Sequence, residues 1–375
     1  MKENSPVGIY IHVPFCVRKC AYCDFYSFHA GEDVQERYFG DLSSEIAASP
    51  YTGQDVRSIF IGGGTPSVVK PQFVEKTLDE VRRQFSVLKD AEITIEANPG
   101  TVTEGSLKAY RRAGINRLSM GLQSANQKTL AKLGRIHSFA DFERSFLLAR
   151  KCGFDNISVD LMSALPGETL SDFENSLFQV LSYRPEHLSV YSLIIEENTP
   201  FYALYNEESG TLLRELPDEE EDRQMTAAAN RILDAAGYRH YEISNYARPG
   251  YGSVHNEGYW TGVPYLGFGP AAASCIDGRR FKNALSMTWF EEPYIETEEL
   301  SSEDLENEFM ILGLRMMRGV DDREFRKRFG LSFFDRYRGV IEKYIRLGAL
   351  ERKGEVLRLT PYGIDVSNVV FADLI

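Results

Sequence analysis

Short apolar segments alternate with longer amphipathic segments along the first half of the chain. Six segments rich in Val, Ile, Leu and Tyr predict strands, because most of them also end at Gly, Pro or Asn. These strands are expected at residues 7–14, 56–64, 91–99, 116–124, 156–167 and 187–195. Residues 33–48, 71–85 and 138–152 carry apolar side chains at every third or fourth position, which predicts helices. Strands that alternate with helices in this order predict a parallel sheet.

The positions of the polar motifs favour a barrel over an open sheet. Gly62–Thr65, Glu96–Pro99, Gln123 and Asp160 lie toward the C-terminal ends of successive predicted strands. A barrel builds its site from many strand ends, whereas an open sheet confines the site to the point where the strand order reverses. The predicted fold class is therefore α/β, with a partial (β/α)6 TIM-like barrel, incomplete because six strands are visible before the pattern weakens.

The rest of the chain is expected to form an extension and a small terminal domain. Residues 218–237 predict a further helix that opens with acidic residues, which favour a helix N-terminus. Residues 238–250 predict a strand outside the parallel series, and residues 251–290 are rich in Gly and aromatic residues. Helices near 304–318, 321–329 and 332–348, a hairpin and a last helix from Pro361 predict a winged-helix-like domain. The expected domains are 1–237, 238–303 and 304–375, the middle one closing the barrel.

The net charge of −13 is unevenly distributed along the chain. Residues 291–308 hold nine acidic residues and no Lys or Arg, whereas residues 309–375 are net basic. The acidic stretch is interpreted as a linker or, equally, as the solvated face of a helix. The overall charge disfavours non-specific binding to nucleic acid, which needs Lys and Arg. The sequence shows neither a membrane-spanning run nor a secretory signal, so a cytoplasmic location is expected.

Three of the five cysteines fall within eight residues, as Cys16, Cys20 and Cys23, directly after the first predicted strand. Three thiolates can hold three irons of a four-iron cluster and leave the fourth iron open. An open iron can chelate S-adenosylmethionine, and Tyr22 would pack against its purine. A zinc site is the alternative, and its fourth ligand would be His12, Asp24 or His29. Cys152 and Cys275 are expected in the core.

The segment YIHVPFCVRKCAYCDF, residues 10–25, resembles the radical S-adenosylmethionine (radical SAM) superfamily. Together with Gly-Gly-Gly-Thr-Pro at residues 62–66, it resembles the branch of oxygen-independent coproporphyrinogen III oxidases, and most closely the HemW-type heme chaperones. The resemblance covers nearly the whole chain. It implies a partial barrel with a C-terminal domain, a [4Fe-4S] cluster held by the three cysteines, and bound S-adenosylmethionine.

The resemblance also implies which residues contact S-adenosylmethionine. The glycine turn can present its backbone to a ligand, although a glycine triplet alone is often only a turn. Glu96 can hold amino or hydroxyl groups, or it can serve as a cap or an ion-pair partner. Arg135 can instead pair with a carboxylate on a helix, and whether a second S-adenosylmethionine binds is left open. The expected cofactor contacts are Tyr10, Tyr22, Gly63, Gly64, Thr65, Glu96, Gln123, Arg135, Asp160, Ser192 and Ala273.

Two departures from the oxidase pattern favour a heme carrier. Phe25 stands where the oxidase carries a fourth cysteine, and only 15 residues precede Cys16, where the oxidase has a longer extension. Both departures match the HemW-type proteins, so oxidative decarboxylation of coproporphyrinogen III to protoporphyrinogen IX becomes the alternative function. Whether the chain turns over as an enzyme is left open, and no catalytic residue is assigned.

The segment His255–Trp260 resembles the His-Asn-x-x-Tyr-Trp motif for heme binding. A neutral imidazole can ligate heme iron, and aromatic rings can cover the macrocycle. The expected heme contacts are His255, Asn256, Tyr259 and Trp260, with His29 as an alternative ligand. Hydrogen bonding of His255 within a loop is the simpler interpretation. The expected partners are heme, a heme-acceptor protein and a reductant such as flavodoxin or ferredoxin, and contact with a membrane surface is compatible with them.

Overall fold

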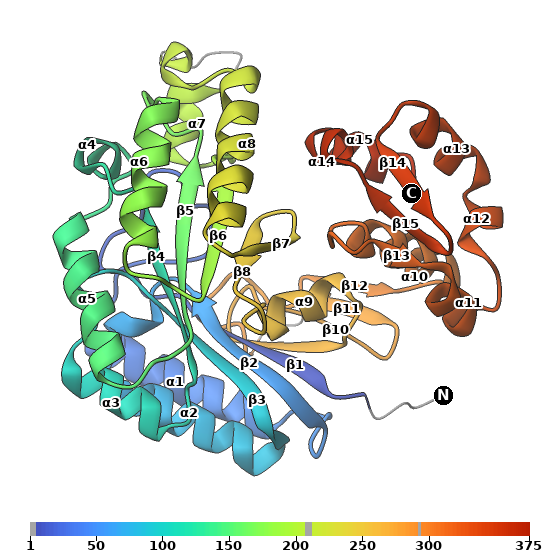
Figure 1. Cartoon of the computed structure of the whole chain (residues 1–375). Coiled ribbons are helices and arrows are strands. Elements are labelled where there is room, and N and C mark those ends of the chain that lie inside the picture. Colours follow the sequence, from blue (N-terminus) through green and yellow to red (C-terminus); the bar gives the residue numbers. More distant parts are fainter. Residues whose placement is uncertain (1–4, 207–211, 292–293) are drawn as a thin grey trace.

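One large sheet carries most of the chain. The computed structural model describes residues 5–206, 212–291 and 294–375. Its six leading strands run parallel in chain order, as the sequence predicts (Figure 1). They are β1 (Val7–Val13), β2 (Asp55–Gly63), β3 (Ser86–Ala97), β4 (Arg117–Gln123), β5 (Ile157–Ser163) and β6 (His187–Ser192).

Helices cover the outer face of this sheet (Figure 1). Their apolar side chains, such as Leu42, Leu78 and Phe142, belong to the same buried core as the strands. The strands are apolar along most of their length because parallel sheets are covered on both faces, and all seven residues of β4 are buried. The helices of this part are α1 (Glu32–Ala47), α2 (Pro71–Gln84), α3 (Glu104–Arg112), α4 (Gln127–Lys132), α5 (Phe139–Lys151), α6 (Leu170–Leu181), α7 (Pro200–Tyr205) and α8 (Glu219–Ala235).

The barrel stays open because further strands extend both edges of the sheet instead of closing it. Beyond β6 lie β8 (Asn245–Ala247) and β7 (Arg239–Glu242), which pair antiparallel. The single strand expected at residues 238–250 is therefore wrong, since this segment folds back on itself as two strands. At the other edge, β9 (Tyr265–Phe268) adds a parallel strand beside β1 that the sequence pattern does not reveal.

The acidic stretch is neither wholly a linker nor wholly a helix. The described part of it forms β12 (Glu296–Glu299) and the start of α10 (Ser302–Gly313), while residues 292–293 lie outside the described residues. The carboxylates of β12 face the basic strand β11 (Arg279–Lys282), in pairs such as Arg280 with Glu298 at 3.0 Å. The expectation of a linker misses these basic partners because they come from a strand earlier in the chain. β10 (Ala273–Ile276) connects β11 to β9.

The last 70 or so residues fold around a hydrophobic core of their own, which includes Phe325, Phe333 and Leu357. Helices precede a hairpin, as expected, and β13 joins the hairpin in a three-stranded sheet. The elements after α10 are β13 (Val320–Asp321), α11 (Asp322–Phe329), α12 (Phe333–Arg336), α13 (Arg338–Arg346), β14 (Leu350–Lys353), β15 (Val356–Leu359), α14 (Pro361–Asp365) and α15 (Ser367–Ala372). No helix among the described residues is long and apolar enough to cross a membrane.

A buried carboxylate holds helix α9 (Val254–Trp260) against the sheet. Glu92 of β3 accepts hydrogen bonds from the backbone N–H groups of Val254 and His255, both at 3.1 Å. It also accepts a hydrogen bond from the hydroxyl of Ser253 at 3.4 Å and lies 3.8 Å from the fully buried Arg117. An anion at a helix N-terminus satisfies amides that have no partner within the helix, so Glu92 fixes where α9 begins.

We expect Glu92→Ala to destabilise the fold by about 3 kcal/mol or more, because it leaves the buried guanidinium of Arg117 unpaired and the first amides of α9 unsatisfied. Denaturant unfolding measures this change. Glu104→Ala is the matched control, since Glu104 pairs with Lys108 at the surface, where an ion pair contributes little, so its loss should cost much less. Equal losses in the two variants would contradict the role of Glu92.

Candidate functional site

A hollow of about 740 Å³ lies at the C-terminal ends of the parallel strands. It brings together eleven of the residues expected at the cluster and the cofactor, from segments far apart in the sequence. These are Cys16, Cys20, Tyr22, Cys23, Gly63, Gly64, Thr65, Glu96, Gln123, Arg135 and Asp160. Burial at the mouth of a barrel strengthens the electrostatic interactions of such groups, because water is largely excluded.

The loop that carries the three cysteines is fixed at both ends. The amide of Cys16 donates to the carbonyl of Phe28 at 2.9 Å, and the amide of Phe28 donates to the carbonyl of Pro14 at 2.8 Å. In between, the amide of Ala21 donates to the carbonyl of Leu133 at 3.0 Å, beside the end of α4. All three cysteines are free and half-buried, so their thiols are available inside the hollow.

The glycine turn is required by close packing beneath it. Gly63 has a φ of +107°, and a Cβ atom there would lie 2.6 Å from the ring of His12. A Cβ atom on Gly64 would lie 2.7 Å from the carbonyl oxygen of Phe15. Glycine alone fits such positions, so the turn brings bare backbone to the edge of the hollow.

The zinc alternative gains no support from the histidine beneath this turn. The imidazole of His12 is buried and hydrogen-bonds the hydroxyl of Tyr10 at 3.0 Å and the carbonyl of Tyr26 at 2.8 Å. Both ring nitrogens are therefore occupied. Asp24 and His29 are exposed. Across the described parts of the chain, no three His, Cys, Asp or Glu side chains gather around a point where a single metal ion could sit.

Two half-buried carboxyl groups, those of Glu96 and Asp160, line the hollow. Burial, together with the neighbouring Asp160, raises the pKa of Glu96 to about 8. Burial also raises the pKa of Asp160, although Arg117 opposes this effect. Glu96 accepts a hydrogen bond from the amide of Gly63 at 3.1 Å, and Asp160 accepts one from Ser119 at 3.3 Å. These carboxyls would become more acidic beside a positively charged ligand.

Several features of the hollow fit a bound ligand. Gln123 closes β4 with a φ of +70°, which is strained for a residue other than glycine. Its side chain is buried, yet its amide oxygen Oε1 has no hydrogen-bond partner. The Nε atom of Arg135 is also buried without a partner. Buried polar atoms normally have a hydrogen-bond partner, so these two atoms indicate that a polar ligand belongs in the hollow. The bare glycine turn and the three thiols fit a cluster beside such a ligand.

Three expected contacts lie outside the residues that line the hollow. Tyr10 lies within the barrel, where it hydrogen-bonds His12 and stacks on Phe60 with ring centroids 6.3 Å apart. Ser192 donates to Asp222 at 2.7 Å. Ala273 belongs to β10, where it pairs with Lys282. The cofactor role of these residues stays a prediction. The two further cysteines, Cys152 and Cys275, are half-buried and lie away from the other three.

The hollow also contains residues that the sequence does not single out as contacts, notably Asn98, Ser119, Gly121 and Tyr191. Asn98 donates to Thr65 at 2.8 Å and accepts from Arg135 at 2.7 Å, so it holds other lining residues in place. Asn98 could have been found from its position two residues after Glu96. Side chains two residues apart in an extended segment point to the same face, so Asn98 is expected beside Glu96. Tyr191 carries no such signal, because an aromatic residue in a strand usually indicates core packing.

The motif at residues 255–260 is divided between two faces of α9. The buried ring of His255 stacks on Phe60, and its nitrogens hydrogen-bond Ser58 at 3.0 Å and Tyr259 at 2.9 Å. Burial, with a contribution from Arg117, lowers the pKa of His255 to about 3, so the imidazole is neutral. Trp260 instead lies under the guanidinium of Arg315, 4.2 Å from the ring centroid. Iron ligation by His255 would need one of its two present hydrogen bonds to break, because a single ring nitrogen binds the metal.

Comparison with known proteins places the chain in a family. Residues 10–180 match the model of the radical SAM superfamily, and residues 300–366 match that of the HemN C-terminal domain. The heme chaperone HemW of Bacillus subtilis is 37% identical over 372 residues, which cover 96% of this chain and 97% of that protein. The chain belongs to the HemW family. The heme chaperone HemW of Escherichia coli is 36% identical over 376 residues and covers 97% and 96% of the two chains.

Membership in the HemW family, and through it in the radical SAM superfamily, implies a [4Fe-4S] cluster and S-adenosylmethionine. The solved structure of coproporphyrinogen III oxidase (HemN) from Escherichia coli matches with a TM-score of 0.84 at 22% identity, covering 99% of this chain and 90% of that chain. This likeness confirms the predicted partial barrel with an added C-terminal domain.

We expect Cys16→Ser, Cys20→Ser and Cys23→Ser each to abolish cluster assembly, because each removes one of three thiolate ligands. Iron and sulfide content after anaerobic reconstitution measures the effect. Cys152→Ser is the control and should keep the iron content of the unaltered protein. Loss of iron in that variant, or its retention in the other three, would show that the ligand set is wrong.

Glu96 should make the stability of the ligand-free protein depend on pH. Its pKa is about 8 when folded and near 4.5 when unfolded, so folding favours the protonated group. The resulting stabilisation is complete below about pH 4.5 and is lost as the pH rises to 8, by up to about 1.4 kcal/mol per pH unit. Glu96→Gln should therefore match the unaltered protein near pH 5 and exceed its melting temperature at pH 8.5. A constant difference across this range would contradict the raised pKa.

Proposed function

We propose that this chain is a heme chaperone that binds heme and passes it to an acceptor protein, while retaining a cluster and an S-adenosylmethionine site. The observation that carries the proposal is its similarity, over nearly the whole length of both chains, to proteins named heme chaperones. The phenylalanine at position 25 and the motif at residues 255–260 support it.

The residues of the hollow have separate roles in this proposal. The thiols of Cys16, Cys20 and Cys23 hold the cluster, which together with S-adenosylmethionine supplies one-electron reduction of the sulfonium when both are bound. The bare backbone at Gly63 and Gly64 and the carboxyl of Glu96 hold polar groups of S-adenosylmethionine. Tyr22 is half-buried, with its ring centroid 6.3 Å from that of Phe201, and it offers an aromatic face to the purine.

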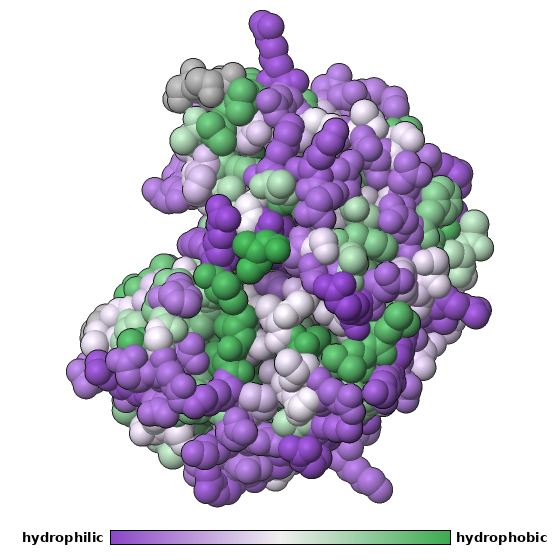
Figure 2. Space-filling model, turned by 90° about the vertical axis from the view of Figure 1, so that its left-hand side faces the viewer, coloured by the Kyte–Doolittle hydropathy of each residue, from purple (hydrophilic) through white to green (hydrophobic). Residues whose placement is uncertain are grey.

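Transfer of heme also needs surfaces for other proteins. Exposed apolar side chains, Val17, Phe25 and Ile136, border the hollow and its neighbouring depressions, and each is more than half exposed. Figure 2 shows hydrophobic residues gathered along a notch in one face of the molecule. Exposed apolar patches of this kind commonly mark interaction sites. We assign this rim to docking of the acceptor or of a reductant such as flavodoxin or ferredoxin.

Heme titration set beside porphyrinogen turnover tests the proposal. Under anaerobic conditions, the cluster-loaded protein should bind hemin with about 1:1 stoichiometry, seen in the Soret absorbance. With S-adenosylmethionine and a reductant, it should form no protoporphyrinogen IX from coproporphyrinogen III. Sustained formation of protoporphyrinogen IX would support the oxidase alternative, and absence of hemin binding would overturn the carrier.

His255→Ala tests the predicted iron ligand within the same titration. If the imidazole ligates iron, the Soret maximum should shift and the affinity for hemin should fall, with the iron and sulfide of the cluster retained. His29→Ala is titrated beside it, because the exposed His29 near the cysteine loop is the alternative ligand, and a spectral change in that variant alone would assign the iron to His29. Unchanged hemin spectra in His255→Ala would show that the ligand assignment is wrong.

A further inference from the structure

Arg135 follows helix α4 and lines the hollow that contains the three cysteines. Its Nη1 atom donates to the sulfur of Cys20 at 3.4 Å, and its Nη2 atom donates to the side chain of Asn98 at 2.7 Å and to the carbonyl of Gly121. None of these partners is a carboxylate. The sulfur of Cys20 is therefore the only one of them that carries a negative charge, once its thiol is ionised.

The sulfurs of the other two cysteines have neutral donors. The hydroxyl of Thr65 lies 3.6 Å from the sulfur of Cys16, and the same hydroxyl accepts a hydrogen bond from Asn98 at 2.8 Å, which leaves its proton free for the sulfur. The backbone amide of Phe25 donates to the sulfur of Cys23. Each of the three sulfurs thus has a hydrogen-bond donor, and the guanidinium is the only cation among these three donors.

Donors at these sulfurs affect how readily a cluster accepts an electron. Reduction adds one negative charge to the cluster, so hydrogen bonds to its sulfurs stabilise the reduced form more than the oxidised form and raise the reduction potential. A charge-assisted hydrogen bond is about twice as strong as a neutral one, so the donor at Cys20 should have the largest effect. Its position is fixed, because Asn98 and Gly121 hold the same guanidinium at the ends of the neighbouring strands β3 and β4.

We propose that Arg135 sets the reduction potential of the cluster through its hydrogen bond to the sulfur of Cys20 and makes the cluster easier to reduce. This inference rests on the proposed function, which retains the cluster. In the step concerned, a one-electron donor protein is oxidised and the cluster is reduced by one electron, while Arg135 keeps all its protons and no bond breaks. The Nε atom of Arg135 has no partner, so it stays available to S-adenosylmethionine and the two roles do not compete.

The test is a redox titration of the full-length, reconstituted protein without S-adenosylmethionine, followed by electron paramagnetic resonance. At the midpoint potential of the unaltered protein, Arg135→Gln should lower the ratio of reduced to oxidised cluster about tenfold, or ~59 mV for a one-electron couple. Arg135→Lys keeps the charge but cannot reproduce the planar set of donors, so its midpoint should fall about half as far. Thr65→Val removes a neutral donor and should lower the midpoint less than Arg135→Gln does.

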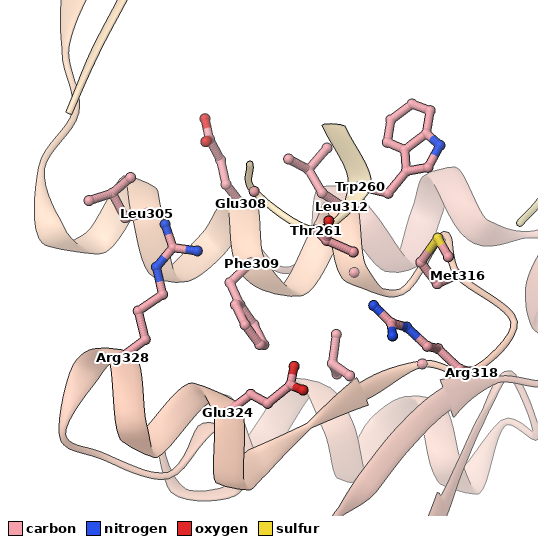
Figure 3. Close-up of a pocket in the computed structure, with 14 residues that line it drawn as sticks. Trp260, Thr261, Leu305, Glu308, Phe309, Leu312, Met316, Arg318, Glu324 and Arg328 are labelled. Carbon is pink, nitrogen blue, oxygen red and sulfur yellow. The ribbon is translucent and has the colours of Figure 1, made fainter. Parts of the chain in front are cut away.

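The matched control is Arg328→Gln, which removes an exposed positive charge from α11. Figure 3 shows Arg328 beside another hollow, and none of the residues that line it also lines the hollow with the cysteines. This variant should keep the midpoint of the unaltered protein, and an equal shift there would assign the effect to net charge and overturn the inference.

Iron and sulfide content shows which variants hold a full cluster. An unchanged midpoint in whichever Arg135 variant assembles one would overturn the role of Arg135 and leave the carrier function intact. Failure of the unaltered protein to assemble a cluster or to bind hemin would instead contradict the proposed function, and neither result depends on any substitution at Arg135.

Discussion

The guanidinium of Arg135 connects the cysteine loop to the ends of two strands, and the geometry of the site depends on it. It donates to the sulfur of Cys20 at 3.4 Å, to Asn98 at 2.7 Å, and to the carbonyl of Gly121. Asn98 then donates to Thr65, whose hydroxyl lies 3.6 Å from the sulfur of Cys16. Two of the three cysteines are thereby held over the barrel by one chain of polar contacts. A fixed arrangement of donors of this kind needs little reorganisation when ligands bind.

The site also contains acidic groups whose charged form is disfavoured by burial. Two carboxyls with raised pKa values and a strained glutamine lie at the ends of neighbouring strands. Natural proteins concentrate such strain and such pKa shifts at functional sites. Helix α9 has a comparable double role, because a buried carboxylate fixes its N-terminus while its two faces serve different parts of the molecule. One face seals the barrel with His255, and the other meets the C-terminal domain with Trp260.

Much of this arrangement could be predicted from the sequence, because its signals are local. Apolar runs ending in polar motifs predict the six parallel strands, and the polar motifs mark the edge where Glu96, Gln123 and Asp160 meet. The parts that escaped prediction depend on partners distant in sequence. β9 is a strand of four residues that pairs with β1, some 250 positions earlier, and β12 is held by the basic strand β11. Likewise, the sequence predicts a single heme-binding site at residues 255–260, whereas His255 and Trp260 lie on different faces of α9.

The central claim is that a HemW-type chain keeps a cluster with an open iron at the mouth of its barrel. Electron paramagnetic resonance of the reduced, reconstituted protein, with and without S-adenosylmethionine, tests it most directly. The account predicts the signal of a reduced four-iron cluster whose g values shift when S-adenosylmethionine is added, because three cysteines leave one iron free to bind it. A cluster signal that S-adenosylmethionine leaves unchanged, or a protein that takes up zinc and forms no cluster, would contradict the account.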